Sequence, residues 1–455
     1  MPRLPDRLSA ADVLIEGGTV VTVDDAFTVL EDGAVAVSGS QIAAVGPAAE
    51  LRRAFSAREV IDARGHVVLP GLVNAHTHVA MTLFRGMADD LSLEAWLRDH
   101  VWPAEAAFVD RDTVGTGTIL GCVEMLKGGV TSALDMYWFP RECALAARRA
   151  GFRLVVGGVL VDGTGADGLE PGVRLAENRA LLEEFGADSL IGVSIQPHST
   201  YAVSPEHLLE ARVLADEFGV LFALHAAETE AETRMVEARY GRRPVPHLHA
   251  LGLLGPRTTL HHAVHLDDEE IGLLARSGTA AVPCLESELK LASGVPRLPD
   301  LLRAGVPVGL GTDGAASNND LDMWSEMRLA ALLFKAMEKD PTAVPAREAL
   351  RLATRGGARA LGRDHLIGSL EVGKRADIVL VDFDRPHLTP VYDVVSHLVY
   401  AVNKGDVTTV LVNGRAVVRD GRMTTLDERE VMADVRQVAE RIGLRDRPRI
   451  PGGGR

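Results

Sequence analysis

Short apolar runs alternate with longer segments of helical spacing through the middle of the chain. Eight of these runs have the length and composition of buried strands; they are residues 67–75, 130–135, 152–160, 190–196, 219–224, 258–261, 279–283 and 306–312. The segment 204–218 is typical of those between them, with Leu208, Leu209, Ala211 and Leu214 on one helical face. Eight alternations predict a (β/α)8 barrel, in which functional side chains gather at the C-terminal ends of the strands. A doubly wound sheet is disfavoured because no glycine-rich phosphate turn follows the first run.

Both ends of the chain have a β-rich texture instead. Short strands bounded by turn residues are expected at residues 11–18, 34–39, 376–382 and 407–414. Neither end is large enough to bury a core alone, so the two ends are expected to pair. The predicted organisation is a composite β-sandwich domain from residues 1–66 and 361–455, with a C-terminal helix and tail, around a catalytic barrel of residues 67–360. Three glycines near the end predict a mobile tail from residue 445.

Composition and charge exclude several classes of function. The chain has 455 residues, is 47% hydrophobic and carries a formal charge of −15, without the basic stripe of a nucleic-acid-binding protein. No apolar stretch reaches the roughly 18 residues of a membrane helix. The first residues lack a signal-peptide pattern, so we expect a cytoplasmic protein. Its three widely spaced cysteines are expected to be small buried side chains in a reducing compartment.

Side chains able to bind a metal stand at the ends of three runs. His76 and His78 close the first run, and residues i and i+2 of a strand point to the same side. His225 ends the fifth run and Asp313 ends the eighth. Three imidazoles and one carboxylate suit zinc or another divalent ion with open positions for water. No lysine ends the fourth run, so a modified lysine that bridges two metal ions is not expected. This favours one metal ion over two.

Two further residues extend this constellation toward hydrolysis. Glu228 follows His225 by three residues, and His262 follows the sixth run. Water on such a metal has its pKa lowered toward ~7 and becomes a nucleophile. Asp313 would accept the proton of this water, His262 would stabilise the developing charge, and Glu228 would carry protons to the leaving group. The pattern indicates hydrolysis of a carbon–heteroatom bond at an electron-poor carbon.

Three motifs resemble those of the amidohydrolase superfamily, in its branch of single-metal aromatic deaminases. They are residues 70–78, 225–229 and 311–323. Further stretches resemble the S-adenosylhomocysteine, 5′-methylthioadenosine and adenosine deaminases; they are residues 81–91, 96–97, 102–105, 197–201 and 289–294. The resemblance implies that hydroxide on one divalent ion attacks the amino-bearing carbon of a 6-aminopurine nucleoside and releases ammonia. Zinc is the first choice, with iron(II) or another divalent ion as alternatives, and a homo-oligomer is expected.

The same resemblance assigns substrate-binding residues. It implies that Glu105 binds the ribose hydroxyls, that His198 and Trp96 contact the substrate, and that Arg174 lies near the ribose tail. A carboxylate suits a vicinal diol because it can accept two O–H hydrogen bonds.

Two positions depart from the pattern of these deaminases. Glu288 stands in place of an asparagine. If it lines the pocket, it should favour rings with an additional N–H donor; otherwise it should pair with a neighbour such as Lys290. Leu190 stands where an arginine often precedes the fourth strand, which weakens the case for a long charged substrate tail.

Two alternative functions stay open. One is an aminohydrolase or chlorohydrolase of another small amino-heterocycle, such as a guanine-like base, a pterin or an s-triazine. The other is a non-catalytic scaffold, against which the complete set of metal-capable side chains argues. A fold resemblance alone does not fix the substrate.

Overall fold

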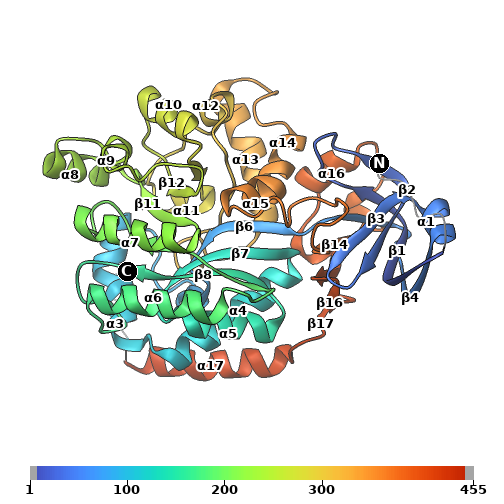
Figure 1. The fold of residues 1–455 in the computed structure, drawn as a ribbon, viewed down its shortest axis with the longest axis horizontal. Coiled ribbons are helices and arrows are strands. Elements are labelled where there is room, and N and C mark those ends of the chain that lie inside the picture. The colour runs from blue at the N-terminus through green and yellow to red at the C-terminus, as the bar shows by residue number, and fades with distance from the viewer. Residues whose placement is uncertain (1–7, 446–455) are drawn as a thin grey trace, which may run out of the picture.

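The eight apolar runs form a closed ring of parallel strands in the computed structural model, which describes residues 8–445 (Figure 1). The ring consists of β6 (Leu72–Thr77), β7 (Val130–Tyr137), β8 (Arg153–Leu160), β9 (Ile191–Val193) with β10 (Gln196–Pro197), β11 (Phe222–Ala226), β12 (Thr258–His262), β13 (Ala280–Val282) and the extended segment 306–313. A bridge between Ile195 and Phe222 joins the fourth strand to the fifth. The amide of Asp313 donates to the carbonyl of His76 and closes the ring. The predicted (β/α)8 barrel is confirmed.

Helices cover the outside of the barrel. They are α4 (Arg111–Lys127), α5 (Pro140–Ala150), α6 (Pro171–Phe185), α7 (Pro205–Phe218), α8 (Glu230–Tyr240), α9 (Pro244–Ala250), α10 (Asp268–Ser277), α11 (Leu285–Lys290), α12 (Leu298–Arg303), α13 (Met323–Glu338), α14 (Ala346–Arg351), η3 (Leu352–Gly356) and α15 (Gly357–Ala360). The connection after β6 contains η1 (Val79–Phe84), α2 (Leu93–Trp96), η2 (Leu97–Val101) and α3 (Trp102–Phe108). Helix α7 begins where Ser204 caps the amide of His207 and ends at left-handed Gly219. Within residues 8–445, no helix is long and apolar enough to cross a membrane.

The two chain ends pair in one nine-stranded sheet, seen beside the barrel in Figure 1. Its strands are β1 (Ser9–Val21), β2 (Val29–Ser38), β3 (Gln41–Pro47), β4 (Phe55–Asp62), β5 (His66–Pro70), β14 (Ile378–Asp382), β15 (Val407–Val412), β16 (Arg415–Arg419) and β17 (Arg422–Met423). Short helices in the same parts of the chain are α1 (Ala48–Ala54), η4 (Pro386–Leu388), α16 (Val394–Tyr400) and η5 (Lys404–Asp406). Successive residues of β2 face opposite sides: Val35 packs in one cluster with Ile378 and Leu380, whereas Ala36 packs with Leu51 of α1. The predicted small β-domain therefore has a core shared by both ends.

The first apolar run is divided between the sheet and the barrel. Its first half, β5, pairs with β1 and β14, and its second half is the barrel strand β6. Gly71 lies between them, where a Cβ atom would lie only 1.9 Å from Oγ1 of Thr131. We propose that the domain boundary lies at Gly71, and the limit at residue 361 stays a prediction.

The C-terminal helix α17 (Glu428–Arg445) lies against the barrel, and its Glu428 also accepts the amide of Met423 in β17 at 2.9 Å. Its Val431 packs with Ile119 and Val123 of α4 and Ala146 of α5, and Figure 1 shows it running along the lower edge of the barrel. The assignment of this helix to the composite β-domain stays a prediction. From residue 446 on, the predicted tail lies outside the described residues, as do the first seven residues, where the absence of a signal peptide was expected.

A buried ion pair ties the small sheet to the barrel. The guanidinium of Arg153 in β8 donates to both carboxylate oxygens of Asp377, at 2.7 and 3.0 Å, and each side chain is 3% exposed. Asn413 completes the network, since its side-chain oxygen accepts from Arg153 and its amide donates to Asp377 at 2.8 Å. Such a pair is satisfied on both sides, so removal of one partner leaves a charge buried without compensation.

Asp377→Asn should lower the free energy of unfolding by about 3–5 kcal/mol, because Arg153 then remains charged in a buried site. Chemical denaturation measures this loss. Asp99→Asn is the matched control, since Asp99 also pairs with an arginine, Arg98, but on the surface; its unfolding midpoint should not change. Equal midpoints for the two variants would show that the buried pair does not stabilise the junction.

Candidate active site

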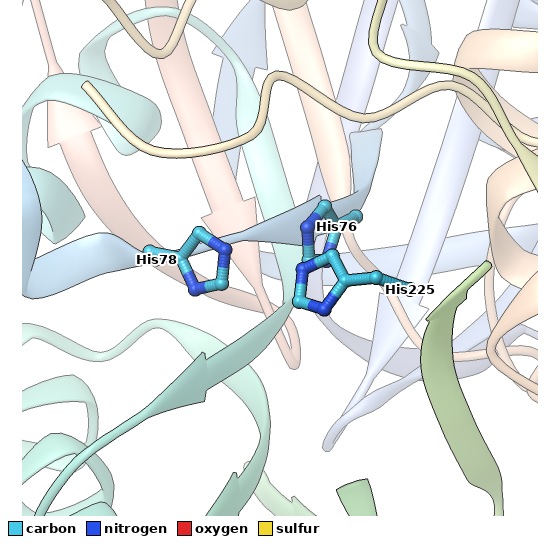
Figure 2. Close-up of side chains that lie close together, drawn as sticks. All are labelled: His76, His78 and His225. Carbon is cyan, nitrogen blue, oxygen red and sulfur yellow. The ribbon is translucent and has the colours of Figure 1, made fainter. Parts of the chain in front are cut away.

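Three histidines converge at the C-terminal end of the barrel (Figure 2). His76 lies in β6, His78 directly follows that strand, and His225 lies in β11. One ring nitrogen from each lies within 4.8 Å of the others. In a second group, one ring nitrogen each of His76 and His262 and a carboxylate oxygen of Asp313 also lie within 4.8 Å of one another. The strand-end positions from which the sequence predicts a metal site are therefore brought together.

Backbone carbonyls orient two of the rings. Nδ1 of His78 lies 2.5 Å from the carbonyl of Met136, and Nδ1 of His225 lies 2.7 Å from the carbonyl of His198. A carbonyl only accepts, so Nδ1 of each ring carries the proton. Nε2 of each is then left with a free lone pair, which is the arrangement of a metal-binding histidine.

His76 and Asp313 complete the set. Neither ring nitrogen of His76, which is fully buried, has a hydrogen-bond partner among the described residues. Oδ1 of Asp313 lies 3.6 Å from Nε2 of His76 and 3.2 Å from Nε2 of His78. Unpartnered buried nitrogens beside a carboxylate fit a metal ion, because polar groups in a protein interior otherwise find partners.

Two serines hold the other oxygen of this carboxylate. Ser287 and Ser317 each donate to Oδ2 of Asp313, at 2.7 and 2.6 Å. Burial raises the pKa of Asp313, but His76 and His78 outweigh it and hold the pKa well below its ordinary value. Asp313 thus stays ionised, as a metal ligand must be.

Glu228 and His262 lie side by side near the ligands. Oε2 of Glu228 lies 3.9 Å from Nε2 of His262. Burial raises the pKa of Glu228 to about 7, which suits a group that exchanges protons at neutral pH. Burial lowers the pKa of His262, but Glu228 and Glu288 outweigh it and raise the pKa to about 10. The structure therefore puts the two predicted proton-handling residues in contact range of each other.

These residues open into a cavity of about 560 Å³. His78, His198, His225, Glu228, His262 and Asp313 line it, together with Trp96, Trp102, Glu105, Tyr137, Trp138 and Tyr201. Glu105 on α3 is only 5% exposed, and burial raises its pKa against the lowering influence of Tyr137 and Trp138. Three of the five predicted substrate-binding residues, Trp96, Glu105 and His198, thus line the same cavity as the metal-capable cluster.

Arg174 is not among the residues that line this cavity. Its guanidinium donates to both oxygens of Asp167, at 2.8 and 2.7 Å, and to the carbonyls of Val161 and Gly163, at 3.0 and 2.8 Å. Val161 and Gly163 do line the cavity. Arg174 therefore supports the wall of the cavity from behind, and the predicted contact with a ribose tail finds no support.

Glu288 also lies outside the cavity lining. It is 1% exposed, and its Oε1 lies 3.5 Å from Nδ1 of His262, on the side of the ring away from Glu228. Lys290 contacts Asp89 and Asn319 instead, each at 2.6 Å. The expectations that Glu288 faces the substrate or pairs with Lys290 are therefore both replaced by a contact with His262.

Leu190 precedes β9 and so lies at the end of the barrel opposite to the metal-capable cluster. Its replacement of an arginine therefore says little about the substrate tail.

Some residues of the site were missed from the sequence. His261 is fully buried and stacks on His76 with ring centroids 3.8 Å apart. Trp138 lines the cavity directly after β7. Both stand at or just after the C-terminal end of a barrel strand, so the signal that identified the metal ligands could have identified them. Ser287 and Ser317 have no such signal.

Comparison with known proteins identifies the family. The model of the amidohydrolase family matches residues 67–417. The chain belongs to the amidohydrolase family. A shorter match, over residues 33–55, is to the imidazolonepropionase-like composite domain of bacteria, in the small sheet of this amidohydrolase.

Relatives of this amidohydrolase include several deaminases. It is 48% identical to a 5-methylthioadenosine/S-adenosylhomocysteine deaminase of Syntrophobacter fumaroxidans, over 95% of this chain and 99% of that one. It is 46% identical to a 5′-deoxyadenosine deaminase of Methanothermobacter thermautotrophicus, over 82% and 87% of the two chains.

Two solved structures are similar over nearly the whole chain. An adenosine deaminase from Xanthomonas campestris with bound zinc superimposes with a TM-score of 0.94 at 42% identity, covering 96% of this chain and 100% of that one. An atrazine chlorohydrolase from Arthrobacter aurescens complexed with zinc gives a TM-score of 0.88 at 27% identity, covering 94% and 100%.

The purified amidohydrolase should contain one divalent ion per chain, because the two groups of candidate donors share His76; they are His76, His78 and His225, and His76, His262 and Asp313. His225→Ala should remove most of this metal while the chain stays folded. His198→Asn is the control: His198 is a cavity histidine whose side chain is not in the ligand set, so the metal should remain. Elemental analysis and circular dichroism check both variants. Two ions per chain, or full metal in His225→Ala, would contradict the assignment.

Proposed function

We propose that this amidohydrolase is a metal-dependent aminohydrolase that removes the 6-amino group of a purine nucleoside as ammonia. The observation that carries the proposal is Glu105. This buried carboxylate lines the same cavity as the hydrolytic cluster and suits the two hydroxyls of a ribose. The deaminase names of the relatives and the zinc-containing adenosine deaminase support the same reaction.

The metal fits His76, His78, His225 and Asp313, and zinc is the ion that this donor set favours. A divalent ion bound there supplies Lewis acidity and activates water at neutral pH. Glu228 takes and returns protons, because its raised pKa lets both forms exist near neutrality. Nε2 of His262, on the same side of the cavity as Glu228, would donate to the attacking oxygen and stabilise the charge that develops on attack.

The walls of the cavity indicate which nucleosides fit. Trp96, Trp102 and Trp138 offer apolar surface for a planar base. No lysine or arginine is among the described residues that line the cavity, and Arg174 is fully engaged behind it. A small apolar 5′ group therefore suits the cavity better than a charged amino-acid tail.

A second candidate is hydrolysis of another amino-heterocycle, such as a guanine-like base, a pterin or an s-triazine. The likeness to an atrazine chlorohydrolase favours including it in the test. Such substrates lack ribose, so Glu105 should be dispensable for them.

A cytoplasmic location, a homo-oligomeric state and the lack of a nucleic-acid partner remain predictions.

An ammonia-release assay with adenosine, 5′-deoxyadenosine, 5′-methylthioadenosine, S-adenosylhomocysteine, guanine and an s-triazine tests the substrate class. The nucleosides should react, and kcat/KM for 5′-methylthioadenosine should exceed that for S-adenosylhomocysteine by about tenfold or more, the size of a missing charged hydrogen bond. Glu105→Gln should raise KM for the nucleosides. Turnover of only the ribose-free rings, unaffected by Glu105→Gln, would favour the second candidate.

Glu228→Gln should retain its metal and lose at least ~10²-fold in kcat, the usual scale of a general acid–base group. Glu230→Gln is a matched control, because Glu230 lies two residues away but is exposed and pairs with Arg234; its kcat should equal that of the wild type. Steady-state kinetics with the fastest nucleoside measures both. A Glu228→Gln enzyme near the wild-type rate would move the proton-transfer role elsewhere.

A further inference from the structure

Helix α11 places two consecutive side chains directly behind two functional residues. Ser287 donates to Oδ2 of Asp313 at 2.7 Å, and Oε1 of the next residue, Glu288, lies 3.5 Å from Nδ1 of His262. Ser287 and Glu288 are both 1% exposed. Asp313 and His262 line the cavity, whereas Ser287 and Glu288 do not. Helix α11 therefore contacts the cavity-lining residues Asp313 and His262 through Ser287 and Glu288.

The position of α11 is fixed by a buried carboxylate. Glu326 of α13, which is fully buried, accepts the amides of Leu285 and Glu286, each at 3.0 Å. Within α11, Oε1 of Glu288 also accepts the amide of Cys284 at 2.9 Å. Both the helix and its glutamate are thus held in place from several directions, as a supporting group for a catalytic side chain needs to be.

The imidazole of His262 lies between two carboxylates. Glu288 is near Nδ1, and Oε2 of Glu228 is 3.9 Å from Nε2. An ionised carboxylate only accepts hydrogen bonds, so at Nδ1 it favours the ring forms in which Nδ1 carries a proton.

We propose that Glu288 is a positioning residue, which holds the Nδ1 proton of His262 and thereby keeps Nε2 directed toward Glu228 and the cavity. Glu288 does not touch the substrate. Its effect on the rate passes through His262, and this part of the inference rests on the proposed deamination. Its effect on the ring of His262 does not depend on any substrate.

Glu288→Gln is the variant that tests this role. Glutamine keeps the shape of the side chain and the acceptor for the Cys284 amide but removes the negative charge. In the metal-loaded enzyme, kcat should fall about 10- to 100-fold, the usual cost of losing a supporting group behind an active-site residue. KM and metal content should stay at wild-type values, because Glu288 neither lines the cavity nor belongs to the ligand set.

A double-mutant cycle separates positioning from a structural role. Glu288→Gln should cost nothing further in a His262→Asn background, since the ring that it supports is absent. Glu270→Gln is the matched control: Glu270 of α10 is also a fully buried carboxylate, but it pairs with Arg243, which precedes α9, and its loss should leave kcat unchanged. A Glu288→Gln loss of the same size in both backgrounds, or no loss at all, would overturn the proposal.

Imidazole ¹⁵N–¹H spectra of histidine-labelled, metal-loaded protein give a readout without substrate. The resonance missing in His262→Asn identifies His262. Its nitrogen shifts should differ between wild type and Glu288→Gln, because the negative charge 3.5 Å from Nδ1 has been removed. Unchanged shifts would overturn the proposal even if the enzyme deaminates nucleosides. Changed shifts would uphold it even if no nucleoside reacts, so the two hypotheses fail separately.

Discussion

Two backbone hydrogen bonds between β6 and the last strand segment close the barrel and assemble the site at the same time; in one of them the amide of Ala75 donates to the carbonyl of Leu310 at 2.9 Å. In the other, the amide of Asp313 donates to the carbonyl of His76 at 3.0 Å. His76 and Asp313, which are 237 residues apart in the sequence, can approach this closely because Gly311 has no side chain: a Cβ there would lie 2.8 Å from backbone atoms of His76. With all strands parallel, their C-terminal ends share one rim. Ring closure therefore puts two candidate metal ligands next to each other before any side-chain contact forms.

The two acidic residues at this rim have opposite electrostatic environments. Burial raises the pKa of both, but for Asp313 the neighbouring histidines His76 and His78 outweigh it. Glu228 has less compensation, and its pKa rises to about 7. Separated pKa values in one cavity divide the roles: one carboxylate stays charged beside the metal, and the other can carry a proton. The residue type alone does not determine either role, because both depend on the neighbouring residues that the fold places around each carboxylate.

Strand ends could be predicted from the sequence because a buried parallel strand leaves a continuous apolar run, and the polar residue after it is conspicuous. His76, His225, His262 and Asp313 were all found in this way. The same continuity concealed the division of the first run at Gly71, since β5 and β6 are equally apolar. Glu288 and Arg174 show a different limit. Motif resemblance put both near the pocket, but only the path of α11 and the loop before α6 decides which side of the cavity wall a side chain occupies.

The small sheet takes part in placing the metal-capable residues, although none of them belongs to it. Strand β5 is fixed in register between β1 and β14, with Pro70 opposite Ile378. After a single connecting residue, Gly71, the chain enters β6, which carries His76. Because side chains alternate along a strand, a slip of one residue in β5 would be carried into β6 unless Gly71 absorbed it, and would turn His76 out of the cluster. The buried pair of Arg153 and Asp377 holds the same junction from β8, which is separated from β6 by β7. The composite domain thus fixes the position of β6 along the barrel axis, and with it the position at which His76 contacts Asp313.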